Sequence, residues 1–356
     1  KKMVLKNVLK FIKPTAETLV LPAHIPIFTE LSIHEQAAVC ALLLSAAACL
    51  LLAYKPGKVS DADPRFLNET AWWRLVSFLS FIGNLFVVML PGRFDGEAGA
   101  TAAMSFPWDT LFVHTRIPAG WTFAIWGIIF IGEFAGVVAP LIGVGDGVKP
   151  DGFEVARARG WVAANVAQCL WCAAFRPWCL GLLWLPSILL ATTALCLVAS
   201  EVSGRGESST APLTLVSVPR GLHLGLVTAA CLVNINAFVG TPAAGSLSSP
   251  DSALSIAKVS IAAAQILGAI YGLVLGLPAA SFAVAWGVLG VATGMPTSDA
   301  AAAVGILALE RISSAAKYAG IIVAAISAAS FYNSWNDMGA QAKGEVAAAE
   351  TIKKED

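Results

Sequence analysis

Charged residues are scarce in this chain of 356 residues. Asp, Glu, Lys and Arg together make up 13% of it, and the formal net charge is zero. That charged share is about half of what an average soluble domain carries. Without an excess of basic residues, the chain has no electrostatic basis for holding nucleic acid. The composition therefore excludes a nucleic-acid partner and argues against a water-soluble domain.

Groups for catalysis or for phosphate binding are also missing. We find no Ser-His-Asp set, no paired carboxylates and no phosphate loop, because the Gly-x-Gly-x-Gly of residues 143–147 follows no strand. Most of the seven cysteines lie inside apolar runs, where they act as small hydrophobic residues. Cys169-x-x-Cys172 lacks the second pair that a zinc site needs. These absences predict that the protein is not an enzyme.

Long apolar runs are what the sequence has in abundance. Hydrophobic residues make up 57% of the chain, and several runs exceed about 18 residues, the length that crosses a bilayer as a helix. The predicted fold class is therefore all-α, a polytopic membrane helix bundle with about nine transmembrane helices. The predicted helices cover residues 33–54, 71–90, 121–142, 161–175, 179–200, 221–239, 253–277, 279–294 and 296–332.

The two ends of the chain differ from these runs. Residues 1–13 carry lysines between apolar residues, which predicts an amphipathic helix lying on the membrane surface. Residues 336–356 are polar, and we expect them to fray.

Aromatic residues cluster where a polar loop becomes the run 121–142. Pro118 and Gly120 set a turn there, because proline fixes φ and glycine admits conformations that other residues avoid. Trp121, Phe123 and Trp126 follow at once. Such a ring-lined helix mouth is either a membrane-interface belt or the rim of a site for a flat ligand.

This motif, Pro-Ala-Gly-Trp-x-Phe-x-x-Trp, resembles the loop and second helix of the tryptophan-rich sensory proteins, the translocator protein (TspO/MBR) family. Four further features match in family order, and the last is similar to larger members that carry extra helices. They are Asn84, Trp171-x-x-x-Phe175, Ala230-x-x-x-Asn234 and Trp286-x-x-x-Gly290. Two positions depart from the family: Gln168 stands where an asparagine is usual, and Leu226 where a tryptophan is usual.

The resemblance divides the chain into four parts. Residues 1–70 are an N-terminal amphipathic segment with an extra membrane helix, and residues 71–239 are a TspO-like five-helix unit. Residues 240–335 are a C-terminal helical extension, and residues 336–356 are the polar tail. We expect the five-helix unit to close its own cavity, which leaves residues 1–70 and the last helix to form the surface that contacts other proteins or pigments.

Polar groups inside a bilayer are costly, so each is a candidate functional residue. Glu133 stands in the middle of run 121–142, and a carboxylate there must be paired or neutral. Lys258, Arg74 and His223 are candidate partners. Two readings stay open: a buried pair that joins helices, or a group that binds a ligand or magnesium.

Histidines and amides are the remaining candidates. His34, His114 and His223 are either interface residues or axial ligands to the metal of a tetrapyrrole. Gln168 and Asn234 could offer oxygens to a hard cation, although Asn234 better fits a hydrogen bond across helices. In the same way, the glycines at 268, 272 and 276 indicate close helix packing.

The family is known for binding tetrapyrroles and other flat hydrophobic molecules. The resemblance thus implies a non-enzymatic membrane protein that binds porphyrin or chlorophyll, with carotenoid or lipid as further occupants. The cavity is expected among the second to sixth predicted helices. Its ligand-binding residues would be Trp121, Phe123, Trp126, Trp171, Phe175, Gln168, Asn234 and Glu133.

A second reading is a pigment-binding structural subunit of a large photosynthetic complex in the plastid thylakoid. A start at Lys1 in place of methionine, the basic amphipathic N-terminus and the added helices would suit an organelle-imported subunit. A small-molecule transporter ranks last, because Pro186 and Pro278 do not occupy matching halves of two repeats.

Overall fold

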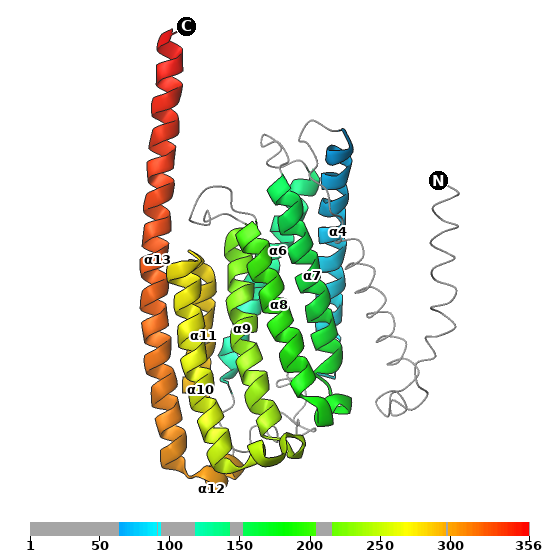
Figure 1. The fold of residues 1–356 in the computed structure, drawn as a ribbon, viewed down its shortest axis with the longest axis vertical. Helices are drawn as coiled ribbons and strands as arrows, with labels where there is room; N and C mark the ends of the chain where they lie inside the picture. Colours follow the sequence, from blue (N-terminus) through cyan, green and yellow to red (C-terminus); the bar gives the residue numbers. More distant parts are fainter. Residues whose placement is uncertain are drawn as a thin grey trace, which may run out of the picture.

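A computed structural model describes residues 64–90, 92–93, 118–142, 152–203, 216–296 and 298–355. These residues form a bundle of roughly parallel and antiparallel helices (Figure 1). The predicted helix 33–54, the amphipathic start 1–13, His34 and His114 lie outside the described residues.

Nine α-helices and five short helical segments make up the described chain. The α-helices are α4 (Pro64–Met89), α6 (Ile125–Val138), α7 (Gly152–Ala174), α8 (Trp184–Ser203), α9 (Ser217–Val239), α10 (Pro250–Ala269), α11 (Pro278–Thr293), α12 (Ser298–Val304) and α13 (Ile306–Glu355). The short segments are η1 (Gly120–Ala124), η2 (Ala139–Ile142), η3 (Pro177–Leu182), η4 (Pro242–Ser248) and the π-helical turn η5 (Ile270–Val274).

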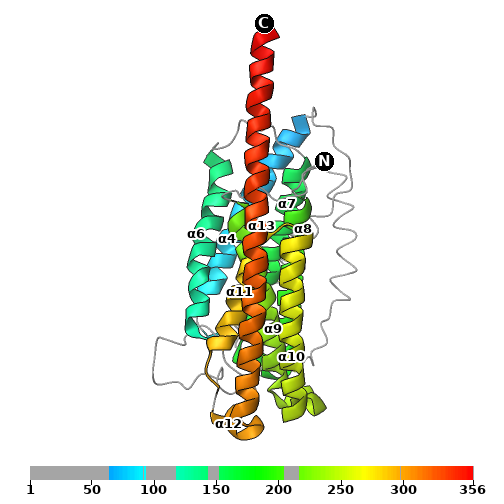
Figure 2. The same ribbon diagram turned by 90° about the vertical axis from the view of Figure 1, so that its left-hand side faces the viewer.

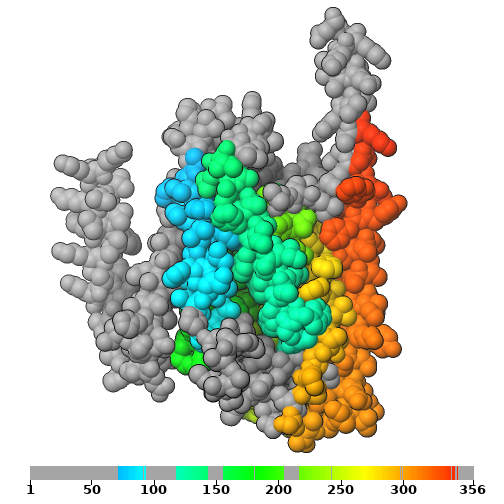
Figure 3. Space-filling model, turned by 180° about the vertical axis from the view of Figure 1, so that it is seen from behind, coloured from blue at the N-terminus to red at the C-terminus, as the bar shows by residue number. Residues whose placement is uncertain are grey.

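The all-α membrane fold predicted from the apolar runs is confirmed. Six described helical stretches are long and apolar enough to cross a membrane, and α11 is a shorter apolar helix. Their outer faces carry large apolar side chains such as Phe86, Ile131 and Leu195, which suit contact with acyl chains. Figure 3 shows one such face, where α4 and α6 lie side by side and α11 and α13 follow.

Several helix bounds differ from the prediction. Helix α4 is described from Pro64 onward, so it includes part of the predicted charged loop. Helix α7 begins at Gly152, where a glycine-rich loop was expected up to residue 160. Gly305, with φ of +81°, separates α12 from α13. Helix α13 then continues to Glu355, so the tail expected to fray is helical and extends past the bundle (Figures 1 and 2).

The helices pack in an order that positions the site. Helix α7 packs on α4 and α8, α9 packs on α8 and α11, and α11 also packs on α13. Helix α6 crosses α4 and α9, while α10 contacts α9, α11 and α13. The predicted glycine ridge is a close contact: a Cβ at Gly268 would lie 2.5 Å from Cγ1 of Val323, and one at Gly272 would lie 2.8 Å from Cγ2 of Ile326. Glycine therefore lets α10 and η5 approach α13 closely.

Candidate functional site: an aromatic cavity and a buried ion pair

A cavity of about 50 Å³ lies where η1, α6, α7, α9 and α11 meet. We call it the aromatic cavity, because four of its twelve lining residues are Phe123, Trp126, Trp171 and Phe175. Leu226, Ala229, Ala230 and Val233 of α9 close one side. Residues from four separate stretches of sequence, 118–126, 171–175, 226–234 and Gly287, thus converge on one largely apolar space.

Five of the residues predicted to bind ligand line this cavity. They are the four aromatic residues and Asn234. The rings of Trp171 and Phe175 stack with centroids 5.5 Å apart, since residues four apart share a helix face. Asn234 accepts a hydrogen bond from Trp171 Nε1 at 3.3 Å, which joins α9 to α7. The hydrogen bond across helices expected for Asn234 is therefore present.

Trp121 lies outside the aromatic cavity. Its ring meets Trp286 edge-on with centroids 4.7 Å apart, and its Nε1 donates to Thr293 Oγ1 at 3.1 Å. The side chain is 41% exposed. Trp121 thus connects η1 to α11. The sequence motif did not indicate this contact.

Helix α11 completes the cavity, so the expectation that the five-helix unit closes its own cavity is wrong. Gly287 is part of the lining, and Trp286 Nε1 donates to the carbonyl of Thr122 at 2.9 Å. The backbone N–H of Ala119 donates to the carbonyl of Gly290 at 2.9 Å. A side chain at Gly290 would collide with Thr122, so glycine is needed there. No described residue of α4 or α8 lines the cavity, although both were expected to.

Glu133 forms a buried pair with His223, one of its three predicted partners. Glu133 Oε1 and His223 Nδ1 are 2.8 Å apart, and neither side chain is exposed. The imidazole meets Trp126 and Trp161 edge-on, with centroids 5.4 and 6.2 Å away. The pair joins α6 to α9 beside the cavity, and neither residue lines it.

Arg220 adds a second charge to this buried cluster. Its guanidinium lies 4.4 Å from the centroid of the Trp161 ring, a cation–π contact that lets a cation stay inside the bundle. The carboxylates of Glu133 and Glu201 attract it, and Arg157 repels it. Arg220 was missed in the sequence, although the rule that singled out Glu133 applies equally to an arginine in an apolar run.

Gln168 belongs to a group of three buried amides. Asn84 Nδ2 donates to Asn165 Oδ1 at 2.9 Å and to Gln168 Oε1 at 2.7 Å, which joins α4 to α7. None of the three lines the aromatic cavity. Asn165 was not predicted as a functional residue. Its position three residues before Gln168 places both amides on one helix face, and this spacing could have indicated it.

Within the described chain, no three His, Cys, Asp or Glu side chains come close enough together to hold a metal ion. His223 does not face the aromatic cavity, because its ring is enclosed by Glu133, Trp126 and Trp161. Its role as an axial ligand stays a prediction, as do those of His34 and His114.

One comparison with known families gives a match. The family model described as TSPO-like protein matches residues 71–329. This range begins within α4 and ends within α13, so it includes the aromatic cavity, the buried pair and the helices that follow α9. No curated protein matches the chain. No solved structure matches it.

Proposed function

The chain belongs to the TSPO-like protein family, and we propose that it is a non-enzymatic membrane protein that binds a flat hydrophobic ligand of the tetrapyrrole class. The observation that carries the proposal is the aromatic cavity. Its rings come from η1, α6 and α7, and its remaining lining is almost wholly apolar. Aromatic faces and apolar side chains favour planar, conjugated molecules by stacking and by burial.

The size of the cavity sets a condition on this function. Its volume of about 50 Å³ is far below the roughly 300–1,000 Å³ of typical ligand pockets, so a whole tetrapyrrole requires side chains to move. Phe123 is the side chain best placed to do so, because it lies at the rim and is 37% exposed. We propose that Phe123 swings outward while the Trp171–Phe175 stack stays in place.

Arg93 supports an acidic ligand. Its guanidinium lies 5.4 Å from the centroid of the Trp171 ring, next to the cavity, and donates to the carbonyl of Val88. A guanidinium pairs well with carboxylates. A porphyrin whose edge carries carboxylates would thus place its ring on Trp171 and its acid groups near Arg93.

Titration with protoporphyrin IX tests the proposal. Binding is followed by the shift of the porphyrin absorption band in detergent-solubilised full-length protein. We expect Trp126→Ala to weaken binding about tenfold, since it removes a stacking face and its buried area. Trp184→Ala is the matched control, because Trp184 lies on α8 outside the lining. Equal affinities of these two variants would refute the site.

A second candidate is a pigment-binding structural subunit of a large photosynthetic complex in the plastid thylakoid. What favours it is α13, which presents Tyr318, Tyr332 and Trp335 outward and continues beyond the bundle. Such a face would serve to dock another subunit or a pigment. Isolation from its native membrane in mild detergent, followed by pigment extraction, tests this function. Recovery of the protein alone and without chlorophyll or carotenoid would reject it.

A further inference from the structure

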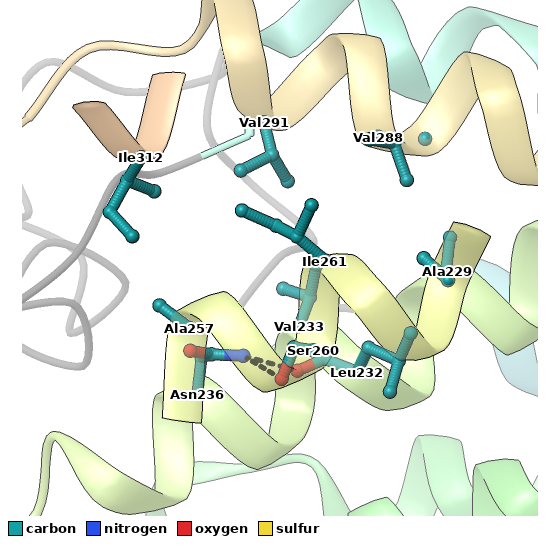
Figure 4. A pocket seen from close by; sticks show the side chains of 12 residues that line it. Ala229, Leu232, Val233, Asn236, Ala257, Ser260, Ile261, Val288, Val291 and Ile312 are labelled. Carbon is teal, nitrogen blue, oxygen red and sulfur yellow. Dashed lines mark hydrogen bonds between the residues drawn. The ribbon is translucent and has the colours of Figure 1, made fainter. Parts of the chain in front are cut away.

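A second cavity lies between α9, α10, α11 and α13 (Figure 4). We call it the slot. Its volume is about 60 Å³, and of its twelve lining residues only Asn236 and Ser260 are polar. It is separate from the aromatic cavity, although Ala229, Val233 and Gly287 contribute to both. Because α10, α11 and α13 follow the five-helix unit, the slot exists only through the C-terminal extension.

The shape of the slot favours a chain over a ring. Ala229, Ala257, Ala264 and Gly287 leave room because their side chains end at Cβ or lack it. The space they leave amounts to about 60 Å³, and apolar cavities stay dry and accept apolar guests. Ala229 and Asn236 are seven residues apart on α9, so the slot runs about 10 Å along that helix. Figure 4 shows Asn236 and Ala257 at one end, and Ala229 and Val288 at the other.

Asn236 supplies one polar group at the end of this apolar space. Its Nδ2 donates to the carbonyl of Leu232 at 2.8 Å and to Ser260 Oγ at 2.9 Å. A carbonyl can only accept, so the contact with Leu232 fixes which way the amide points. Asn236 Oδ1 is buried and has no hydrogen-bond partner among the described residues. Asn236 Oδ1 is therefore an acceptor that a bound donor group could satisfy.

We propose that the slot binds a single hydrocarbon chain that carries a hydroxyl group. The hydroxyl donates to Asn236 Oδ1, and the chain extends along α9 toward Ala229. This direction suits a molecule that comes from the bilayer, because Asn236 is three residues from the end of the span Ser217–Val239. The polar end then lies near the membrane surface and the chain lies deeper. A carboxylate fits less well, since it would bring a second acceptor to Oδ1.

Equilibrium binding of tritiated octan-1-ol, whose extended chain matches the length of the slot, to the full-length protein in nanodiscs tests the proposal. We expect saturable binding above partition into the lipid. The competitor 1-methoxyoctane has almost the same chain and no donor, so it should compete at least tenfold more weakly than unlabelled octan-1-ol. Absence of saturable binding, or equal competition by the ether, would overturn the proposal.

Two variants locate the binding. Ala257→Phe fills the slot and should reduce affinity at least tenfold. Val259→Phe is its control, since Val259 lies on the same helix, is 67% exposed and does not line the slot. Asn236→Leu removes the acceptor, so the alcohol and the ether should then bind equally. Alcohol affinity that is the same in Ala257→Phe and Val259→Phe would place the ligand elsewhere.

Protoporphyrin IX titration and circular dichroism of each variant check that the bundle is intact. If Ala257→Phe does not fold, Asn236→Leu decides alone: a preference for the alcohol that survives in this variant overturns the assignment.

Discussion

Helices α6, α7 and α9 contribute both to the aromatic cavity, which η1 and α11 complete, and to the surroundings of the buried Glu133–His223 pair, yet one region is open space and the other is filled with polar groups. His223 and Asn234 are 11 residues apart on α9, about 16 Å along the helix. Near His223, the rings of Trp126 and Trp161 and the guanidinium of Arg220 pack together. Near Asn234, alanines on α9 and Gly287 on α11 leave room.

Trp126 connects the two regions. Its ring lines the aromatic cavity and lies 5.4 Å from the His223 ring. We infer that the Glu133–His223 pair determines how α6 packs on α9, and that this packing leaves the space of the aromatic cavity. Variants of each region test this inference.

Breaking the buried pair should have the largest effect. His223→Leu leaves the Glu133 carboxylate without its partner inside the bundle, so we expect a loss of about 3–5 kcal/mol in the free energy of unfolding. The double variant Glu133→Leu with His223→Leu should recover most of that loss, because neither member of the pair is left without the other and Glu201 still attracts Arg220. Thermal unfolding followed by circular dichroism measures both. Glu310→Leu, which alters an exposed carboxylate on α13, is the control and should change little. If the single and double variants are equally unstable, the pair does not act as a unit.

Removing Asn84, the central residue of the three buried amides, should have the next largest effect. Asn84→Leu leaves Asn165 Oδ1 and Gln168 Oε1 without their shared donor, at a cost of about 1–3 kcal/mol. Chemical denaturation in mixed micelles measures the change. Ser80→Ala on the same helix, which loses only a bond from its own hydroxyl to the Ser77 carbonyl, should cost roughly 0.5 kcal/mol or less. A similar cost for both would contradict a special role for the amides.

The contribution of α11 to the cavity is tested by Trp286→Phe. The change removes the hydrogen bond from Nε1 to the Thr122 carbonyl, worth about 0.5–1.5 kcal/mol, and should loosen η1. We expect protoporphyrin IX affinity to fall roughly threefold, since the rim is less well fixed. Trp335→Phe, at a side chain that is 69% exposed on α13, should leave affinity unchanged. Unchanged affinity in Trp286→Phe would show that this hydrogen bond does not hold the rim of the cavity in place.

The smallest effect is expected for Trp121→Phe. Its hydrogen bond to Thr293 is exposed to the surroundings, so we expect a stability change of about 0.5 kcal/mol or less. Porphyrin affinity should stay the same, because Trp121 does not line the cavity. A tenfold loss in the same titration would show that the motif's first tryptophan contacts ligand after all.

Several residues that line the aromatic cavity were predicted from the sequence. Phe123, Trp126, Trp171, Phe175 and Asn234 were predicted as lining residues and do line one cavity. Their signal was a set of spacings within single helices, which local geometry preserves. Trp121, Gln168 and Glu133, which were also predicted to bind ligand, do not line this cavity and contact residues far away in the chain.

The sequence by itself determined that this is an all-α membrane protein of the TSPO-like family, because apolar length and motif spacing are local properties. Only the tertiary structure decided which polar group meets which. Glu133 pairs with His223, which is 90 residues away in the sequence, and Trp286 donates to the carbonyl of Thr122, which is 164 residues away. The sequence allowed Gln168 to contact a ligand. In the structure α4 packs on α7, and Gln168 accepts a hydrogen bond from Asn84. Most buried polar groups have a hydrogen-bond partner, and helix packing determines which groups come within reach.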